Sequence, residues 1–110
     1  MFSKAKGDIA ETLAVKHLKK LGFKIVKRNY FAKKMGEIDI IASKDSVYHF
    51  IEVKSGVGFD PVYNLTPSKL NKIIKSSMFY LKENNLDVAY CIDAIIVRDT
   101  QIEFLENLTL

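Results

Sequence analysis

Two acids and a lysine lie in neighbouring apolar segments of the sequence, at a spacing suited to metal-dependent chemistry. Asp39 lies in residues 36–42, and Glu52 and Lys54 lie in residues 50–54. Both segments are rich in isoleucine, valine or phenylalanine, which predicts two β-strands. The polar run between them predicts a hairpin turn, so the two strands should pair directly.

The predicted hairpin brings the two acids together. With Lys44-Asp45 at its tip, Asp39 would face Phe50, and Glu37 would face Glu52. Because side chains alternate between the faces of a strand, Asp39 and Glu52 would be diagonal neighbours on one face. Two carboxylates placed in this way are within reach of one shared cation.

This arrangement predicts a site for phosphodiester hydrolysis. The carboxylates of Asp39 and Glu52 would repel each other and lose hydration, and Mg²⁺ or Mn²⁺ would relieve both costs. Lys54, on the same face, could hold the attacking water or stabilise developing negative charge. Taken alone, Glu-x-Lys is most often a solvated ion pair. The apolar strand around it and the aligned second acid favour the metal site.

Length and composition indicate one globular domain, residues 1–110. A hydrophobic content of 48% suffices for a modest core. No apolar run is long enough to span a bilayer, and residues 1–6 lack the apolar core of a secretory signal. We therefore expect a cytoplasmic protein with no membrane partner. We expect Cys91 to be a small buried hydrophobe, and His17 and His49 to be structural or solvated residues rather than metal ligands.

Charge is distributed unevenly along the chain. Residues 1–34 hold ten lysines and arginines against two acids, a balance of +8, whereas residues 83–110 have a balance of −5. The basic third, with Lys33 and Lys34 at its end, is a candidate phosphate-binding surface. Ordinary solvated lysines would give the same composition.

Hydrophobic periodicity predicts an α/β fold in the order αβββαββ. A helical crossover should make the strand after the second helix parallel to the third strand, which gives a mixed central β-sheet flanked by helices. Residues 55–65, rich in glycine and proline, form a loop that could cover a substrate or serve as a connector. The predicted helices are residues 5–21 and a second helix that opens at Thr66-Pro67 and is ended by Asn84-Asn85. The predicted strands are residues 23–31, 36–42, 47–54, 88–97 and 102–105.

Glu11 lies at the edge of the apolar arc of the first predicted helix, beside Val15 and Leu18. An acid flanked by apolar side chains could reach into a site from its rim, although a surface glutamate needs no such role. Gly22 suits the position just after this helix. The expected apolar arc consists of Ile9, Ala10, Leu13, Ala14, His17, Leu18 and Leu21.

The second predicted helix carries a candidate phosphate-binding surface. Thr66 should cap it, with Pro67 in its first turn. Lys69 in that first turn opposes the helix dipole, which is reasonable if it faces phosphate, and Lys72 lies on the same lysine-bearing side. Phe79 among the lysines could be a stacking surface, a homodimer contact or covered by the C-terminal segment. The expected buried face consists of Leu70, Ile73, Ile74, Ser77, Met78 and Leu81.

The order of elements, with twelve residues between Asp39 and Glu52-Val53-Lys54, resembles the PD-(D/E)xK nuclease superfamily. The chain resembles the small bacterial YraN-like family within it more closely still. The family pattern usually continues with Thr-Arg, where this chain has Ser55-Gly56, and the missing arginine removes one phosphate contact. The resembling segments are residues 7–11, 21–30, 36–41, 50–54, 66–69 and 92–93.

The resemblance implies a restriction endonuclease-like core and a Mg²⁺- or Mn²⁺-dependent endonuclease. Glu11, Asp39 and Glu52 would hold the metal, and Lys54 would complete the catalytic set. The expected partner is nucleic acid, DNA rather than RNA, including branched recombination or repair intermediates. A non-catalytic nucleic-acid-binding module or an assembly factor on the same fold is the alternative. The expected nucleic-acid contacts are Lys33, Lys34, Lys69 and Lys72.

Overall fold

The computed structural model describes residues 2–56, 60–99 and 101–108, with side chains described from residue 8 onward. The elements confirm the predicted α/β order, with one addition, a short 3₁₀ helix before the second α-helix. They are α1 (Phe2–Lys20), β1 (Lys24–Phe31), β2 (Glu37–Lys44), β3 (Val47–Ser55), η1 (Pro61–Asn64), α2 (Pro67–Glu83), β4 (Ala89–Arg98) and β5 (Gln101–Leu105).

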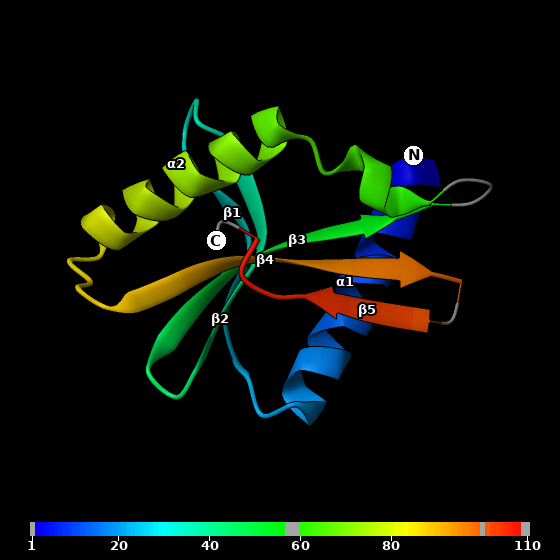
Figure 1. Cartoon of the computed structure of the whole chain (residues 1–110), viewed down its shortest axis with the longest axis horizontal. Coiled ribbons are helices and arrows are strands. Elements are labelled where there is room, and N and C mark those ends of the chain that lie inside the picture. The colour runs from blue at the N-terminus through cyan, green and yellow to red at the C-terminus, as the bar shows by residue number, and fades with distance from the viewer. Residues whose placement is uncertain (1, 57–59, 100, 109–110) are drawn as a thin grey trace.

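The strands form one mixed sheet in the order β1-β2-β3-β4-β5. Every neighbouring pair is antiparallel except β3 and β4, which are parallel, as the helical crossover between them predicted. The two α-helices lie on opposite faces of this sheet (Figure 1). Neither of them is both long and apolar enough, within the described residues, to cross a bilayer.

The core under α1 contains small helix residues packed on strand isoleucines. Ala10, Ala14 and Leu18 are buried against Ile51 and Ile95. Two alanines bring the helix close to the sheet, and this closeness brings the acid between them into the interior. The predicted apolar arc of α1 is wrong at its margins, because Ile9 is 62% exposed and Leu21 is 41% exposed.

The core under α2 is more aromatic. Ile73 and Tyr80 pack with Phe50 and Ile92 of the sheet, and the ring centroids of Tyr80 and Phe50 lie 5.9 Å apart. The predicted buried face of α2 is wrong at Met78, which is 56% exposed. Tyr80 is buried there instead, because its large aromatic ring packs over the sheet.

The ends of both helices follow their local sequence. Gly22 adopts a positive φ of 92° just after α1, a conformation that glycine takes without strain. The backbone N–H of Phe23 then donates to the Leu18 carbonyl at 3.0 Å. Thr66 caps α2 as predicted, its hydroxyl accepting from the backbone N–H of Lys69 at 3.3 Å. These stops set where each chain segment enters the sheet.

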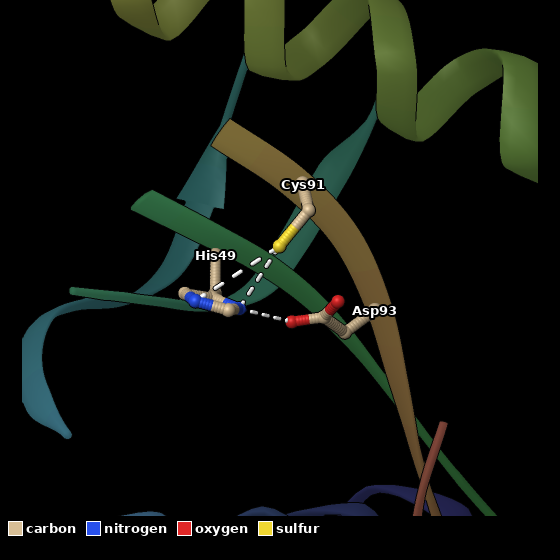
Figure 2. Close-up of side chains that lie close together, drawn as sticks. All are labelled: His49, Cys91 and Asp93. Carbon is tan, nitrogen blue, oxygen red and sulfur yellow. Dashed lines mark hydrogen bonds and ion pairs between the residues drawn. The ribbon is translucent and has the colours of Figure 1, made fainter. Parts of the chain in front are cut away.

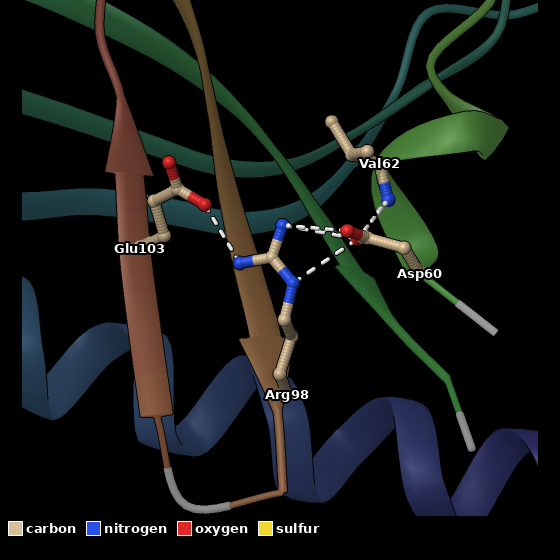
Figure 3. A network of polar contacts seen from close by, with 4 residues as sticks. All are labelled: Asp60, Val62, Arg98 and Glu103. Atoms are coloured by element: carbon tan, nitrogen blue, oxygen red, sulfur yellow. Dashed lines mark hydrogen bonds and ion pairs between the residues drawn. The ribbon is translucent and has the colours of Figure 1, made fainter. Parts of the chain in front are cut away.

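The connection after β3 is joined to β4 and β5 by side-chain hydrogen bonds (Figure 3). Asp60 caps η1 by accepting from the backbone N–H of Val62 at 3.1 Å, and it also accepts from Arg98 Nε at 3.1 Å. Arg98 in turn donates to Glu103 at 2.6 Å, which links η1 to β4 and β5. The second half of the predicted loop is therefore an anchored connector, and residues 57–59 lie outside the described residues.

Candidate active site

The β2–β3 hairpin sets the relative position of the two acids. Its ladder runs from Lys44 opposite Val47 to Ile40 opposite Ile51. Asp45-Ser46 therefore forms the tip, and the prediction of a Lys44-Asp45 tip is wrong. Asp45 and Ser46 have positive φ values of 50° and 66°, but neither is glycine, so the turn is only weakly indicated by its residue types.

The observed register differs by two residues from the expected one. Continued past Ile40, it sets Asp39 opposite Glu52, instead of opposite Phe50, and Glu37 opposite Lys54. Ile38 packs in the core under α2 and Ile40 in the core under α1, so strict alternation breaks at Asp39, whose carboxylate turns toward β3. The Asp39 and Glu52 carboxyl groups are close enough for the charge of Glu52 to act on Asp39.

The Asp39 side chain takes the place of a backbone carbonyl as hydrogen-bond acceptor at the end of the β2–β3 ladder. The backbone N–H of Val53 donates to its Oδ2 at 2.8 Å. Burial, followed by the negative charge of Glu52, raises the pKa of Asp39 to about 7, and the Val53 hydrogen bond and the charge of Lys54 counteract only part of this rise. The charge of Glu52 disfavours ionisation of Asp39, so near neutral pH part of the Asp39 population carries a proton.

Lys54 lies beside the second acid. Its Nζ is 3.0 Å from Glu52 Oε1, and the two side chains are only 20% and 14% exposed. Glu52 and Lys54 are two residues apart on β3 and therefore project from the same face. The ammonium group is thus held at the edge of the carboxylate pair, and its charge lowers the pKa of Asp39.

Glu11 approaches Asp39 from α1. The residue is only 8% exposed, so the surface alternative for this glutamate is wrong. Burial raises its pKa first, and the negative charge of Asp39 raises it further. Arg28 of β1 opposes both effects, with its guanidinium 3.5 Å from Glu11 Oε1. Three acids from α1, β2 and β3 therefore act on one another, Glu11 through Asp39 and Asp39 through Glu52.

Three further residues around this group were not assigned to the site from the sequence: Arg28, Asn29 and Glu37. Asn29 interrupts β1 with a positive φ of 53°, which asparagine tolerates better than most residues. With its side-chain nitrogen turned toward the acids, Asn29 donates to Glu11 Oε1 at 3.2 Å and to Glu37 Oε1 at 3.1 Å. An asparagine within a predicted strand was the available signal, because asparagine is depleted in strands.

The four predicted nucleic-acid lysines lie outside the carboxylate group. Lys33, Lys34, Lys69 and Lys72 are all exposed, and none of them pairs with a site acid within the described residues. The turn before β2 packs on α2, since a Cβ added at Gly36 would lie 3.7 Å from Lys72 Cβ. Lys33 Nζ lies 5.7 Å from the ring centre of the half-buried Phe79. The structure therefore brings basic groups of the turn and of α2 together.

Sequence comparison assigns the chain to a family. Residues 10–97 match the family described as "Uncharacterised protein family UPF0102". The chain belongs to this family. UPF0102 proteins similar to it occur in Sulfurovum sp., at 56% identity over 94% of this chain and 93% of the relative. The UPF0102 proteins of Wolinella succinogenes and Helicobacter hepaticus are each 52% identical, over 98% and 100% of this chain and 99% of each relative.

This family membership confirms the expected YraN-like resemblance, and with it the placement in the PD-(D/E)xK superfamily. Within the UPF0102 match lie Glu11, Asp39, Glu52 and Lys54, so all four expected catalytic residues belong to the family region. The names of these relatives give a family designation and do not state an activity. What the site does must therefore be argued from its chemistry.

A hard divalent cation fits the acids of this UPF0102 protein. Glu11, Asp39 and Glu52 offer only carboxylate oxygens, the ligands that Mg²⁺ and Mn²⁺ prefer. The pKa values of Glu11 and Asp39 are raised because Arg28 and Lys54 do not fully offset burial and the charges of the neighbouring acids. A further positive charge placed among the acids would lower those pKa values and stabilise the folded protein.

Proposed function

We propose that this protein is a metal-dependent endonuclease that hydrolyses phosphodiester bonds of DNA. The observation that carries the proposal is the half-buried carboxylate of Asp39, which interacts with Glu52 and is approached by Glu11, with an ammonium group alongside. Such a group of acids destabilises the fold unless a cation is bound, because each carboxylate loses hydration and repels the others. Holding a catalytic cation is a purpose that suits all three.

Glu11, Asp39 and Glu52 would hold Mg²⁺ or Mn²⁺. Bound there, the cation would polarise the phosphoryl group and make water a better nucleophile at neutral pH. Asp39 is already oriented by the Val53 N–H at 2.8 Å, which leaves its second oxygen available. Arg28 and Asn29 hold Glu11 from the other side, so the acids are positioned before any ligand arrives.

Lys54 would act on the reacting phosphate. Its Nζ is 3.0 Å from Glu52, so it is close to the acids without bonding to Asp39. A lysine ammonium has three donors, and two of them stay available to a phosphate oxygen or to the attacking water. Negative charge develops on the phosphate oxygens during hydrolysis, and a fixed cation stabilises it.

The proposed substrate is DNA, which an enzyme in the bacterial cytoplasm meets freely. Lys33 and Lys34 in the turn before β2 and Lys69 and Lys72 on α2 are exposed and supply positive charge near the start of β2. Backbone phosphate contacts of this kind do not select a sequence. Shape is the remaining basis for selection, so we propose branched recombination or repair intermediates as preferred substrates.

Cleavage of labelled linear, single-stranded and four-way-junction DNA with Mg²⁺ or Mn²⁺ tests the proposal. We expect cleavage by the wild type, and its loss in Asp39→Asn and Lys54→Ala. Asp45→Asn is the matched control, because Asp45 is exposed at the hairpin tip, and it should cleave normally. Retained cleavage by Asp39→Asn, or no cleavage of any substrate by a wild type that binds Mn²⁺, would contradict the proposal.

One observation favours a second candidate, a nucleic-acid-binding module that does not cleave. Each of the outer acids already has a cationic partner, Lys54 for Glu52 and Arg28 for Glu11. These two pairs could hold the acids without a metal. The binding module predicts that Asp39→Asn leaves DNA affinity level or raises it, and that Mn²⁺ changes neither the affinity nor the melting temperature.

A further inference from the structure

A second group of polar side chains bridges the two parallel strands (Figure 2). His49 of β3 pairs in register with Cys91 of β4, and Ile51 pairs with Asp93. His49, Cys91 and Asp93 therefore project from the same face, and Figure 2 shows them pointing toward one another. One potential ligand atom from each residue lies within 4.8 Å of the other two.

The contacts converge on one ring nitrogen. His49 Nδ1 lies 2.6 Å from Asp93 Oδ2 and 3.0 Å from Cys91 Sγ. Cys91 is half-buried and makes this polar contact, so the expectation of a purely hydrophobic cysteine is wrong. His49 is buried, so the expectation that it is solvated is wrong.

The surroundings fix the orientation of two of these side chains. Asp93 is fully buried, and its second oxygen accepts from the backbone N–H of Asn107 at 2.8 Å. The edge of the His49 ring packs against Phe23, with ring centroids 4.8 Å apart. Outer contacts of this kind hold the ligands of protein metal sites in place. The Asp93 carboxylate thus presents one oxygen to the group and keeps the other for the fold.

A nucleophilic Cys-His-Asp triad does not explain this geometry. In such a triad, one imidazole nitrogen faces the thiol and the other faces the acid. Here Nδ1 faces both, and Nε2 lies 3.9 Å from the sulfur. Burial, followed by the charge of Asp93, also raises the pKa of Cys91 to about 12, whereas a nucleophilic thiol needs a lowered pKa.

We propose that His49, Cys91 and Asp93 form a binding site for one borderline-soft transition-metal ion of the Zn²⁺ class. A nitrogen, a sulfur and a carboxylate oxygen form a ligand set that Zn²⁺ accepts and that Mg²⁺ and Ca²⁺ do not prefer. Tetrahedral zinc would spread the donor atoms to separations of roughly 3.3–3.7 Å. The observed 2.6 and 3.0 Å are the tighter contacts of donors that share protons, which the ion would displace.

A cavity beside His49 offers the ion a route, and Glu106 in its lining is a candidate fourth ligand. It has a volume of about 410 Å³ and is lined in part by His49, Phe23 and Glu106. The negative charge of Glu106 also reaches Cys91, where it raises the thiol pKa. The fourth position would be taken by Glu106 or by water from the cavity. A bound ion would then join β3 to β4 and stabilise the sheet rather than act in DNA cleavage.

Cobalt spectroscopy tests this site, because thiolate-bound Co²⁺ absorbs in the near ultraviolet. Protein freed of metal with a chelator is titrated with Co²⁺ and then with Zn²⁺. We expect one equivalent of Co²⁺ to produce the thiolate band, Zn²⁺ to abolish it, and excess Mg²⁺ to leave it unchanged. Cys91 is the only cysteine, so the band can come from no other residue of the chain.

Two variants and one control complete the test. Cys91→Ser should abolish the band, and His49→Gln should weaken Zn²⁺ binding by at least about tenfold, the lower bound seen when even outer contacts are removed. Asp39→Asn should leave the band and the affinity intact, because the carboxylate site is separate. Zn²⁺ should raise the melting temperature of the wild type and not that of Cys91→Ser.

Each variant is checked for folding by circular dichroism, and the wild-type titration alone can overturn the proposal if a buried substitution unfolds the chain. Wild-type protein that gives no thiolate band with stoichiometric Co²⁺ would overturn it. So would equal Zn²⁺ affinity in folded Cys91→Ser. Because no DNA is involved, failure here would leave the proposed nuclease function untouched.

Discussion

Asp39 is the residue at which function and stability conflict. Its pKa rises from 3.8 to about 7 on folding, so the folded state binds a proton that the unfolded state has already released between those values. The unfolding free energy contributed by Asp39 therefore falls as the pH rises from about 4 to 7, and the penalty is complete above pH 7. The cost is on the order of a few kcal/mol.

Asp39→Asn should consequently stabilise the metal-free protein at pH 8 by about 1–3 kcal/mol and change little at pH 4. Urea denaturation of wild type and variant across this pH range measures the difference. Asp45→Asn at the exposed hairpin tip is the control and should show no such pH dependence. A stability difference between wild type and Asp39→Asn that stays constant with pH would show that Asp39 is not strained by ionisation.

Lys54 should set the pH at which Asp39 ionises. Its positive charge lowers the pKa of Asp39, so Lys54→Met should move that pKa above about 7. Carbon-detected NMR titration of the Asp39 carboxyl group measures it directly. Lys82→Met on the exposed side of α2 is the matched control, and an identical Asp39 titration in both variants would contradict the assignment.

At the scale of elements, the β2–β3 hairpin holds its register without help from its turn. Both tip residues have positive φ, which usually selects for Asn-Gly or Asp-Gly, and here the second residue is Ser46. The buried ladder of Ile40, Ile41, Phe50 and Ile51 instead determines the pairing, because a slip by one residue would turn these side chains to the opposite faces.

Ser46→Gly should therefore stabilise the protein by about 0.5–1 kcal/mol, since glycine adopts the required φ of 66° without strain. Chemical denaturation measures the gain. Ser43→Gly lies in the neighbouring strand, where glycine weakens the ladder, and it should destabilise by a similar amount. If both glycines destabilise, the turn conformation is not a source of strain.

The elements could be predicted because their signals are local. Thr66, Gly22 and the strand alternation each act within a few residues, and each was located from the sequence. The hairpin register was misjudged by two residues because no glycine marked the turn. The burial of Glu11 depends on how closely Ala10 and Ala14 let α1 approach the sheet. The contact of His49 with Asp93 depends on the pairing of two strands that bring together residues 44 positions apart in the sequence. Neither could be obtained from local periodicity.

At the scale of the whole molecule, charge should govern encounter with nucleic acid. Residues 1–34 carry a net charge of +8, while residues 83–110 carry −5. A polyanion should therefore be attracted to the first segment and repelled by the second. Basic side chains that meet phosphates release counterions, and affinity then falls as salt rises.

Neutralising Lys33 and Lys34 together to glutamine should flatten the slope of log affinity against log salt by up to about 1.8. Fluorescence anisotropy with duplex DNA at several salt concentrations measures it. Lys19 and Lys20 in the last turn of α1 are the matched control pair, and their replacement should change the slope less. Affinity that is independent of salt would indicate a protein partner instead of DNA.

The parallel pairing of β3 with β4 implies an order in which the contacts form during folding. Asp39 and the Val53 N–H are 14 residues apart within one hairpin, and hairpins close in microseconds. His49 and Asp93 are 44 residues apart and meet only after the crossover through α2 is complete, which is a slower kind of contact. The repelling acids thus meet early, and the histidine–cysteine–aspartate group late. An ion held by the first group would hasten the opening steps of refolding, whereas one held by the second would slow the protein's unravelling.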